Sequence, residues 1–170
     1  MTECEVKILG IDKDQLIAKL EAAGAKLLFS GELDVYYYDT ADGDIRAKNE
    51  LLRLRKIGDQ KVELVYKKNR REENGCKVLD EHEIEVSDFD EARIILESLG
   101  YGVRKNYVKT RTEYEFEDLK FVIDEFEGVP AYLEIEGETG QIDEWVKKLD
   151  LGDYERSAET LDELMKRYKK

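Results

Sequence analysis

Hydrophobic and polar residues alternate along several short stretches of the chain. In the first of these, residues 3–8, two acids and a base share one parity and three apolar residues share the other: Glu3, Glu5 and Lys7 against Cys4, Val6 and Ile8. Because successive side chains of a strand point to opposite faces of its sheet, the pattern predicts a strand with one charged face. Taken alone, such a face is typical of a solvated sheet surface.

The same alternation returns in strand after strand. The predicted strands cover 25–30, 34–39, 51–56, 61–68, 82–86, 104–114, 120–126 and 132–136. Gly58-Asp59 predicts a hairpin turn between two of them. The segments 40–49 and 69–75 are polar and predict loops.

Four amphipathic helices separate groups of strands. The first follows a candidate N-cap, Asp12, and ends at Gly24; the second begins at Ser87 or Asp88 and ends at Leu99. A third covers about 141–149, and the last begins near Thr160, whose spacing to Glu163 matches a capping box. Nothing in the composition divides the chain, so we expect one domain over residues 1–170.

Taken together, the strands give a sheet with one charged and one apolar face. The charged parity holds Glu3, Glu5 and Lys7; Arg53 and Arg55; Val65 and Lys67; Glu83 and Glu85; Lys109 and Arg111; Asp124; Glu134 and Glu136. Two arrangements remain open. In one, the sheet is open and its charged face is solvated; in the other, it closes so that the charged face lines an interior and the helices cover the apolar face.

Composition and charge argue against several classes of protein. The 170 residues are 41% hydrophobic and carry a net charge of -13, which argues against a nucleic-acid groove built on bulk charge. No apolar run approaches the roughly 18 residues of a membrane span. The chain shows no secretory signal, so we expect a cytoplasmic protein that does not bind membranes. Cys4 and Cys76 make no disulfide framework and lack metal-ligand spacing.

The charged residues suit a particular chemistry. Arg and Lys bind phosphate oxygens, Arg through its forked guanidinium and Lys as a point charge. Carboxylates suit Mg²⁺ or Mn²⁺, which prefer oxygen ligands and bridge to phosphates. Acids and bases gathered in one enclosure would therefore form a metal–polyphosphate site.

Several of these motifs, in this order, resemble the CYTH, or triphosphate tunnel metalloenzyme, superfamily. Glu3-x-Glu5-x-Lys7 is similar to its ExExK signature, Asp34-Val35-Tyr36-Tyr37 to its D-x-Y-[FY] strand, and Leu52-Arg53-Leu54-Arg55 to its LRxR strand. Further matches are Lys67, Glu83-x-Glu85, Lys109-Thr110-Arg111, Asp124 and Glu134-Ile135-Glu136. The matched set spans residues 3 to 136.

The resemblance implies an α+β fold: a closed antiparallel β-barrel of about eight strands, the triphosphate tunnel, with helices packed outside. It implies that Mg²⁺ or Mn²⁺ is held by the acidic residues Glu3, Glu5, Asp124, Glu134 and Glu136. Substrate phosphates would be bound by Lys7, Arg53, Arg55, Lys67, Lys109 and Arg111. The catalytic group would be Glu5, Lys7, Arg111 and Glu85, with Glu83 as an alternative to Glu85.

The chain departs from the family pattern at three places. Glu32 stands where many relatives have Gln, Val65 replaces the usual Thr, and Ser157-Ala158 replaces a Ser-Tyr pair. These changes affect recognition of the nucleoside end of a substrate more than of its phosphates. Tyr36, Tyr37 and Tyr38 are candidates for stacking on a base or a thiamine ring, although strand aromatics more often serve packing.

The spacing looks closest to the class IV adenylyl cyclase-like branch, which implies conversion of ATP to cyclic AMP and pyrophosphate. The alternative is a triphosphatase acting on inorganic tripolyphosphate, thiamine triphosphate or a nucleoside triphosphate. A second alternative is a non-catalytic module that binds polyphosphate or nucleotide. The resemblance also allows a homodimer.

Overall fold

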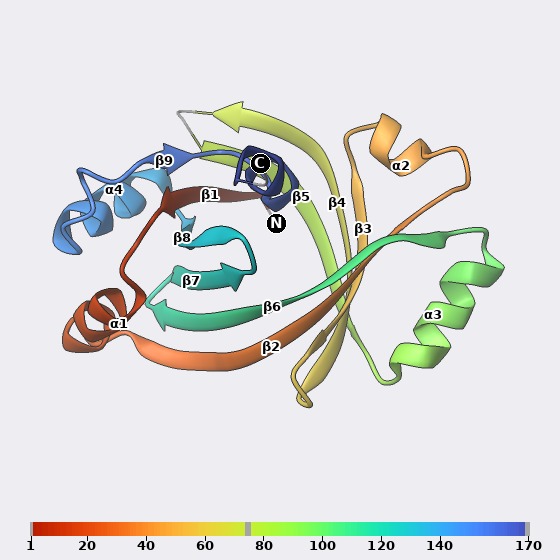
Figure 1. Cartoon of the computed structure of the whole chain (residues 1–170), viewed down its shortest axis with the longest axis horizontal. Helices are drawn as coiled ribbons and strands as arrows, with labels where there is room; N and C mark the ends of the chain where they lie inside the picture. Colours follow the sequence, from red (N-terminus) through yellow and green to blue (C-terminus); the bar gives the residue numbers. More distant parts are fainter. Residues whose placement is uncertain (1, 74–75, 169–170) are drawn as a thin grey trace. The chain divides into compact units, whose positions relative to one another are not determined.

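The fold is known from a computed structural model that describes residues 2–73 and 76–168, with side chains over 4–71 and 78–168. Long strands dominate it and short helices join them (Figure 1). The elements are β1 (Thr2–Leu9), α1 (Lys13–Ala22), β2 (Lys26–Asp39), α2 (Asp44–Ala47), β3 (Leu51–Ile57), β4 (Lys61–Glu73), β5 (Cys76–Val86), α3 (Phe89–Ser98), β6 (Gly102–Phe116), β7 (Leu119–Phe126), β8 (Val129–Gly137), α4 (Thr139–Lys148), β9 (Arg156–Ser157) and α5 (Leu161–Tyr168).

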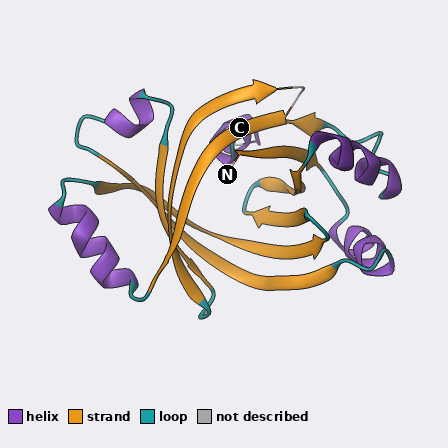
Figure 2. Ribbon diagram, turned by 180° about the vertical axis from the view of Figure 1, so that it is seen from behind, coloured by secondary structure: helices purple, strands orange, loops and turns teal. Residues whose placement is uncertain are grey.

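All the strands belong to one sheet, in which β2 and β6 are long and continuous (Figure 2). The hydrogen-bonded order is β5-β4-β3-β2-β6-β7-β8-β1-β9, and β5 also pairs with β1. This extra pairing closes the sheet, so eight strands form an antiparallel barrel to which β9 is added. The predicted fold class, a closed antiparallel barrel with helices outside, is confirmed. No helix within the described residues has the length and apolar character of a membrane span.

The chain separates into two compact units, which are described one at a time. The main segments of the first are Gly31–Arg71 and Val78–Lys109, and those of the second are Glu3–Ser30 and Thr110–Lys170. The expectation of a single domain over the whole chain stays a prediction.

In the second unit, the apolar parity of the sheet packs against α1 and α4. Ile8 on β1 and Leu133 on β8 are fully buried in one cluster with Leu20 of α1 and Ile142 of α4. Helix α1 begins where predicted, because the Asp12 carboxylate accepts a hydrogen bond from the Gln15 backbone N–H at 3.0 Å. Because the apolar residues of these strands are buried on one face, the residues between them lie on the opposite face.

The first unit repeats this arrangement with α3. Tyr38 on β2 and Leu54 on β3 pack with Ala92 and Leu96 of α3. The Asp88 carboxylate caps the helix by accepting from the Glu91 N–H at 2.9 Å. The apolar parity is again covered by a helix, so the odd-numbered residues of β3 and β4 lie on the opposite, charged face.

Three local features differ from the predictions. The predicted loop 40–49 contains α2, whose first turn is held by the residue just before that segment: the Asp39 carboxylate accepts from the N–H groups of Ile45 (2.9 Å) and Arg46 (3.0 Å). Strand β4 continues into the predicted loop 69–75 as far as Glu73. Cys4 is disulfide-bonded, which the cysteine count did not predict; the side chain of Cys76 lies outside the described range.

Two candidate ion-binding clusters

The second unit gathers charged residues on the face opposite its core. Strand register places Lys7 opposite Glu134 and Glu5 opposite Glu136 between β1 and β8. Arg111 on β6 is opposite Asp124 on β7. The six residues form what we call the acidic cluster: Glu5, Lys7, Arg111, Asp124, Glu134 and Glu136.

Both cations of the acidic cluster are held by carboxylates. The Lys7 Nζ lies 3.0 Å from Glu5 Oε1 and 2.9 Å from Glu134 Oε1. The Arg111 guanidinium donates from Nε and Nη2 to the two oxygens of Asp124, each at 2.8 Å, and its Nη2 lies 3.6 Å from Glu134 Oε2. Because an Arg fork and a carboxylate fit each other in a bidentate pair, Arg111 and Asp124 are fixed in one orientation.

Burial makes these contacts electrostatically strong. Lys7 is 3% exposed and Asp124 is fully buried. Burial alone would lower the pKa of Lys7, but the Glu134 and Glu5 carboxylates outweigh it and raise that pKa above its ordinary value. Burial likewise opposes the charge of Arg111, while Asp124 and then Glu134 and Glu136 raise its pKa. Both groups therefore remain cations at neutral pH.

The acidic cluster offers the right donors for a hard divalent cation. Its carboxylate oxygens are the ligands that Mg²⁺ and Mn²⁺ prefer. Over the described part of the chain, however, no group of three or more His, Cys, Asp or Glu side chains is arranged to hold a metal. The reason is visible in the contacts: Lys7 lies between Glu5 and Glu134, where it serves as their counterion. The chemistry fits a metal, and binding one would require these carboxylates to exchange partners.

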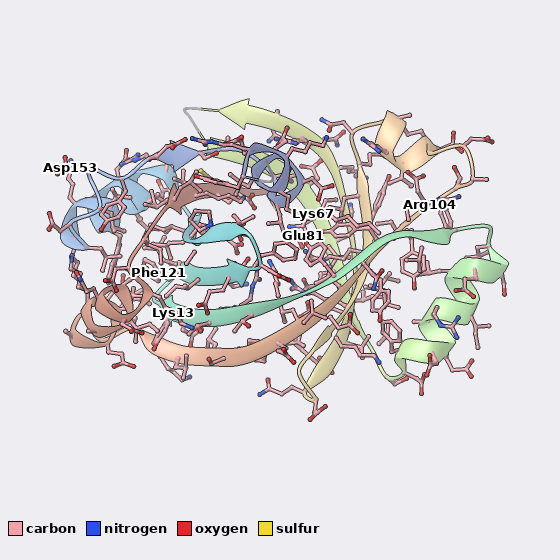
Figure 3. All side chains as sticks on the ribbon, viewed as in Figure 1. Lys13, Lys67, Glu81, Arg104, Phe121 and Asp153 are labelled. Atoms are coloured by element: carbon pink, nitrogen blue, oxygen red, sulfur yellow. The ribbon has the colours of Figure 1, made fainter. Side chains whose placement is uncertain are left out.

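A second group of charges lies on the sheet of the first unit. Strand register sets Arg53 opposite Val65 and Arg55 opposite Glu63 across β3 and β4, so these residues share one face with Lys67. Glu81 on β5 lies beside Lys67, as Figure 3 shows, with Nζ and Oε2 2.6 Å apart. We call these the basic cluster: Arg53, Arg55, Glu63, Lys67 and Glu81.

Glu63 is the most buried member of the basic cluster, at 2% exposure. Its Oε2 accepts from the Arg55 Nε at 2.5 Å, and its Oε1 lies 2.5 Å from the Lys61 Nζ. Burial would raise the pKa of Glu63, but Arg55 and Lys61 together lower it. Arg55 also lies 3.7 Å from Glu83 Oε2. A buried carboxylate thus holds Arg55 in place.

Arg53 differs from the other cations of the basic cluster. Its Nε is buried and has no hydrogen-bond partner within the described residues. A buried donor without an acceptor costs about 1–3 kcal/mol, so native proteins rarely leave one unless something else satisfies it. An anion bound on this face would supply the missing acceptor.

The remaining predicted site residues are placed as follows. Lys109 is buried, at 9% exposure, whereas Glu83 and Glu85 are exposed. Glu136 lies on the face of Glu5 through the β1–β8 register. The side chain of Glu3 lies outside the described range. The structure therefore gathers most of the predicted residues into the two clusters and leaves Glu85 on the surface.

Sequence reasoning missed Glu63 and Glu81. Glu63 shares the parity of Val65 and Lys67, and this was the signal that could have identified it. Glu81 lies one residue before the predicted strand 82–86 and was therefore assigned to no face. Their partners, Arg55 and Lys67, lie on neighbouring positions that only the strand register reveals.

The sequence is similar to that of known proteins. The CYTH domain model matches residues 1–163. The chain belongs to the CYTH domain family. A protein of Methanocaldococcus jannaschii, named "Putative adenylate cyclase MJ0240", is 29% identical over 150 residues, covering 88% of this chain and 85% of its own.

Solved structures share the CYTH fold with this chain. The PH1012 protein of Pyrococcus horikoshii is 25% identical with a TM-score of 0.79, covering 96% of this chain and 99% of its own. HpAC1 from Hippeastrum, described as showing a dominant triphosphatase activity, is 15% identical with a TM-score of 0.69, covering 98% and 95%. At that identity, the second likeness concerns the fold alone.

Proposed function

We propose that this CYTH protein is a divalent-metal-dependent enzyme that acts on a triphosphate substrate, in the manner of a class IV adenylyl cyclase. Its product from ATP would be cyclic AMP, with pyrophosphate released. Family membership and the name of the M. jannaschii relative support the class. The observation that carries the proposal is the buried, unpartnered Nε of Arg53 beside Arg55 and Lys67, which suits a phosphate oxygen.

The pKa directions limit the roles of the cations. In cyclisation, the ribose 3′-oxygen bonds to the α-phosphorus and the bond from that phosphorus to the bridging oxygen breaks. The hydroxyl proton must leave. Because their pKa values are raised, Lys7 and Arg111 cannot take that proton and would instead stabilise charge on the phosphoryl oxygens. Among the predicted residues, this leaves the carboxylates Glu5 and Glu85 as candidate proton acceptors.

A divalent metal would be held by the acidic residues Glu3, Glu5, Asp124, Glu134 and Glu136. When bound, it supplies Lewis-acid polarisation of the phosphoryl oxygens. Among the described residues, the contribution of the chain is to hold Glu5, Asp124, Glu134 and Glu136 on one face, with Lys7 and Arg111 as counterions that a metal ion could replace.

A triphosphatase is the second candidate, with water attacking the terminal phosphorus and phosphate leaving. The activity described for HpAC1, which shares the fold, favours it. A non-catalytic binder is the third, since an anion could accept a hydrogen bond from the Arg53 Nε without any reaction following. The cytoplasmic location and the homodimer stay predictions.

One assay separates the three candidates. The protein is incubated with ATP, thiamine triphosphate and tripolyphosphate in turn, with Mg²⁺ or Mn²⁺, and the products are resolved by chromatography. Cyclic AMP with pyrophosphate and no free phosphate identifies the cyclase, and free phosphate identifies the triphosphatase. Tight calorimetric binding without any product identifies the binder. Absence of both binding and product would contradict the proposal.

A further inference from the structure

Two tyrosines lie on the charged face of the first unit. Tyr37 on β2 is directly opposite Arg53 on β3, so it shares the face of the basic cluster. Tyr107 on β6 contacts it: the two hydroxyl oxygens are 2.9 Å apart and the ring centroids 5.8 Å apart. Tyr107 also precedes Lys109 by two residues and therefore shares its side of the strand.

The neighbouring tyrosines of β2 lie on the helix-covered face, whereas this pair lies on the charged face. Tyr38 is 2% exposed in the core against α3, and the Tyr36 ring packs on Phe89 at 5.0 Å. Tyr37 and Tyr107 point to the opposite face, where each is only half-buried. Part of each ring therefore remains accessible to a ligand bound on that face.

Cationic side chains lie on both sides of the tyrosine pair. Residues directly opposite each other in an antiparallel sheet have Cα atoms about 5 Å apart, so Tyr37 is a cross-strand neighbour of Arg53, whose Nε has no partner among the described residues. On the other side, the Lys105 Nζ lies 4.9 Å from the centre of the Tyr107 ring. The hydroxyl–hydroxyl hydrogen bond holds both rings in place before any ligand arrives, which lowers the entropic cost of stacking on them.

We propose that Tyr37 and Tyr107 form a platform for a planar aromatic group, a nucleobase or comparable heterocycle, on an organic triphosphate whose phosphate chain is bound at Arg53. This inference rests on the proposed function and names its substrate class. Aromatic side chains stack on bases whatever the base identity, with about 1–3 kcal/mol per base. An inorganic tripolyphosphate would occupy the basic cluster and make no use of the platform.

The test compares two ligands that share a triphosphate and differ in the ring. Dissociation constants for ATP and for tripolyphosphate are measured by calorimetry, at one Mn²⁺ concentration, for the wild type and for Tyr107→Leu. We expect ATP binding to weaken about tenfold or more and tripolyphosphate binding to change by less than about twofold. Tyr107→Phe keeps the stacking ring but loses the hydroxyl–hydroxyl hydrogen bond, so it should keep more of the preference for ATP than Tyr107→Leu does. Tyr36→Leu, on the opposite face, is the matched control and should leave the ratio unchanged.

The outcomes are distinguishable. Equal losses for both ligands in Tyr107→Leu, or no loss for either, would overturn the platform while the proposed function stands, because tripolyphosphate still binds the wild type. A Tyr107→Phe variant that loses as much of the ATP preference as Tyr107→Leu would also overturn it, since its stacking ring is intact and only the hydroxyl–hydroxyl hydrogen bond is missing. A wild-type protein that binds neither ligand would overturn the proposed function and the platform with it. Thiamine triphosphate in place of ATP separates a purine from another heterocycle.

Discussion

The acidic and basic clusters both lie on the charged face of a sheet, but they differ in how many carboxylates hold each cation. In the acidic cluster, four carboxylates surround two cations, and both Lys7 and Arg111 are held by at least two of them. In the basic cluster, three cations accompany two carboxylates, and the Arg53 Nε has no partner among the described residues. A ligand of the acidic cluster must therefore displace existing ion pairs, whereas an anion can bind the basic cluster directly.

The largest effect should come from breaking the acidic cluster at Glu134, which contacts both cations. We expect Glu134→Gln to lower turnover of ATP at least about 100-fold, because it removes a metal ligand and a counterion together. The measurement is steady-state turnover with Mn²⁺. Glu115→Gln, which removes a half-exposed partner of Lys26, is the control. Near-normal turnover in Glu134→Gln would show that the assigned metal site is wrong.

Removing the buried carboxylate of the basic cluster tests stability. Glu63→Gln should lower the free energy of unfolding by about 2–3 kcal/mol at neutral pH, since Arg55 and Lys61 lose a buried partner while Arg55 keeps Glu83. Chemical denaturation measures this loss. Glu115→Gln, at an exposed pair, should cost less than about 1 kcal/mol.

The same variant predicts a pH dependence. The pKa of Glu63 is lower in the folded protein than its ordinary value of 4.5, so its stabilisation is present above that value. It is lost as pH falls through the lower folded pKa. Wild-type stability should thus fall more steeply than that of Glu63→Gln below about pH 5. Parallel profiles for the two proteins would show that Glu63 is not held as an ion by Arg55 and Lys61.

A smaller effect should appear as coupling between metal and anion. If a phosphate group also pairs with Lys7 and Arg111, as the family resemblance implies, Glu5 and Glu134 would exchange these counterions for a metal ion. We therefore expect tripolyphosphate to tighten Mn²⁺ binding about tenfold, a coupling of about 1.4 kcal/mol. Titration of Mn²⁺ followed by electron paramagnetic resonance, with and without tripolyphosphate, measures it. Identical Mn²⁺ affinity in both titrations would mean that the acidic cluster does not exchange its partners.

The strands and their faces were predictable because burial imposes a period of two. Ile8, Leu54 and Leu133 alternate with Lys7, Arg55 and Glu134 as the core requires, and the helix caps at Asp12 and Asp88 lie where local sequence placed them. These features depend on neighbours within a few residues. Strand faces and helix caps could therefore be predicted from the sequence.

Features set by partners across the sheet were not predictable. Helix α2 is a local exception, since the Asp39 carboxylate that holds it lies only six and seven residues before the N–H groups it accepts from. The roles of Glu63 and Glu81 depend on which residues of adjacent strands they meet, which a one-dimensional pattern does not contain. The lack of a partner for the Arg53 Nε is likewise a property of three-dimensional packing.

Calorimetric titration of Arg53→Gln with tripolyphosphate tests the anion site most directly. Hydrogen bonds to charged groups contribute about 1.5–3 kcal/mol, so loss of the guanidinium should weaken binding at least about tenfold. Arg93→Gln, which removes an exposed guanidinium paired with Glu97, should bind like the wild type. Equal affinity in Arg53→Gln and the wild type would show that the Arg53 Nε does not bind a phosphate oxygen of tripolyphosphate.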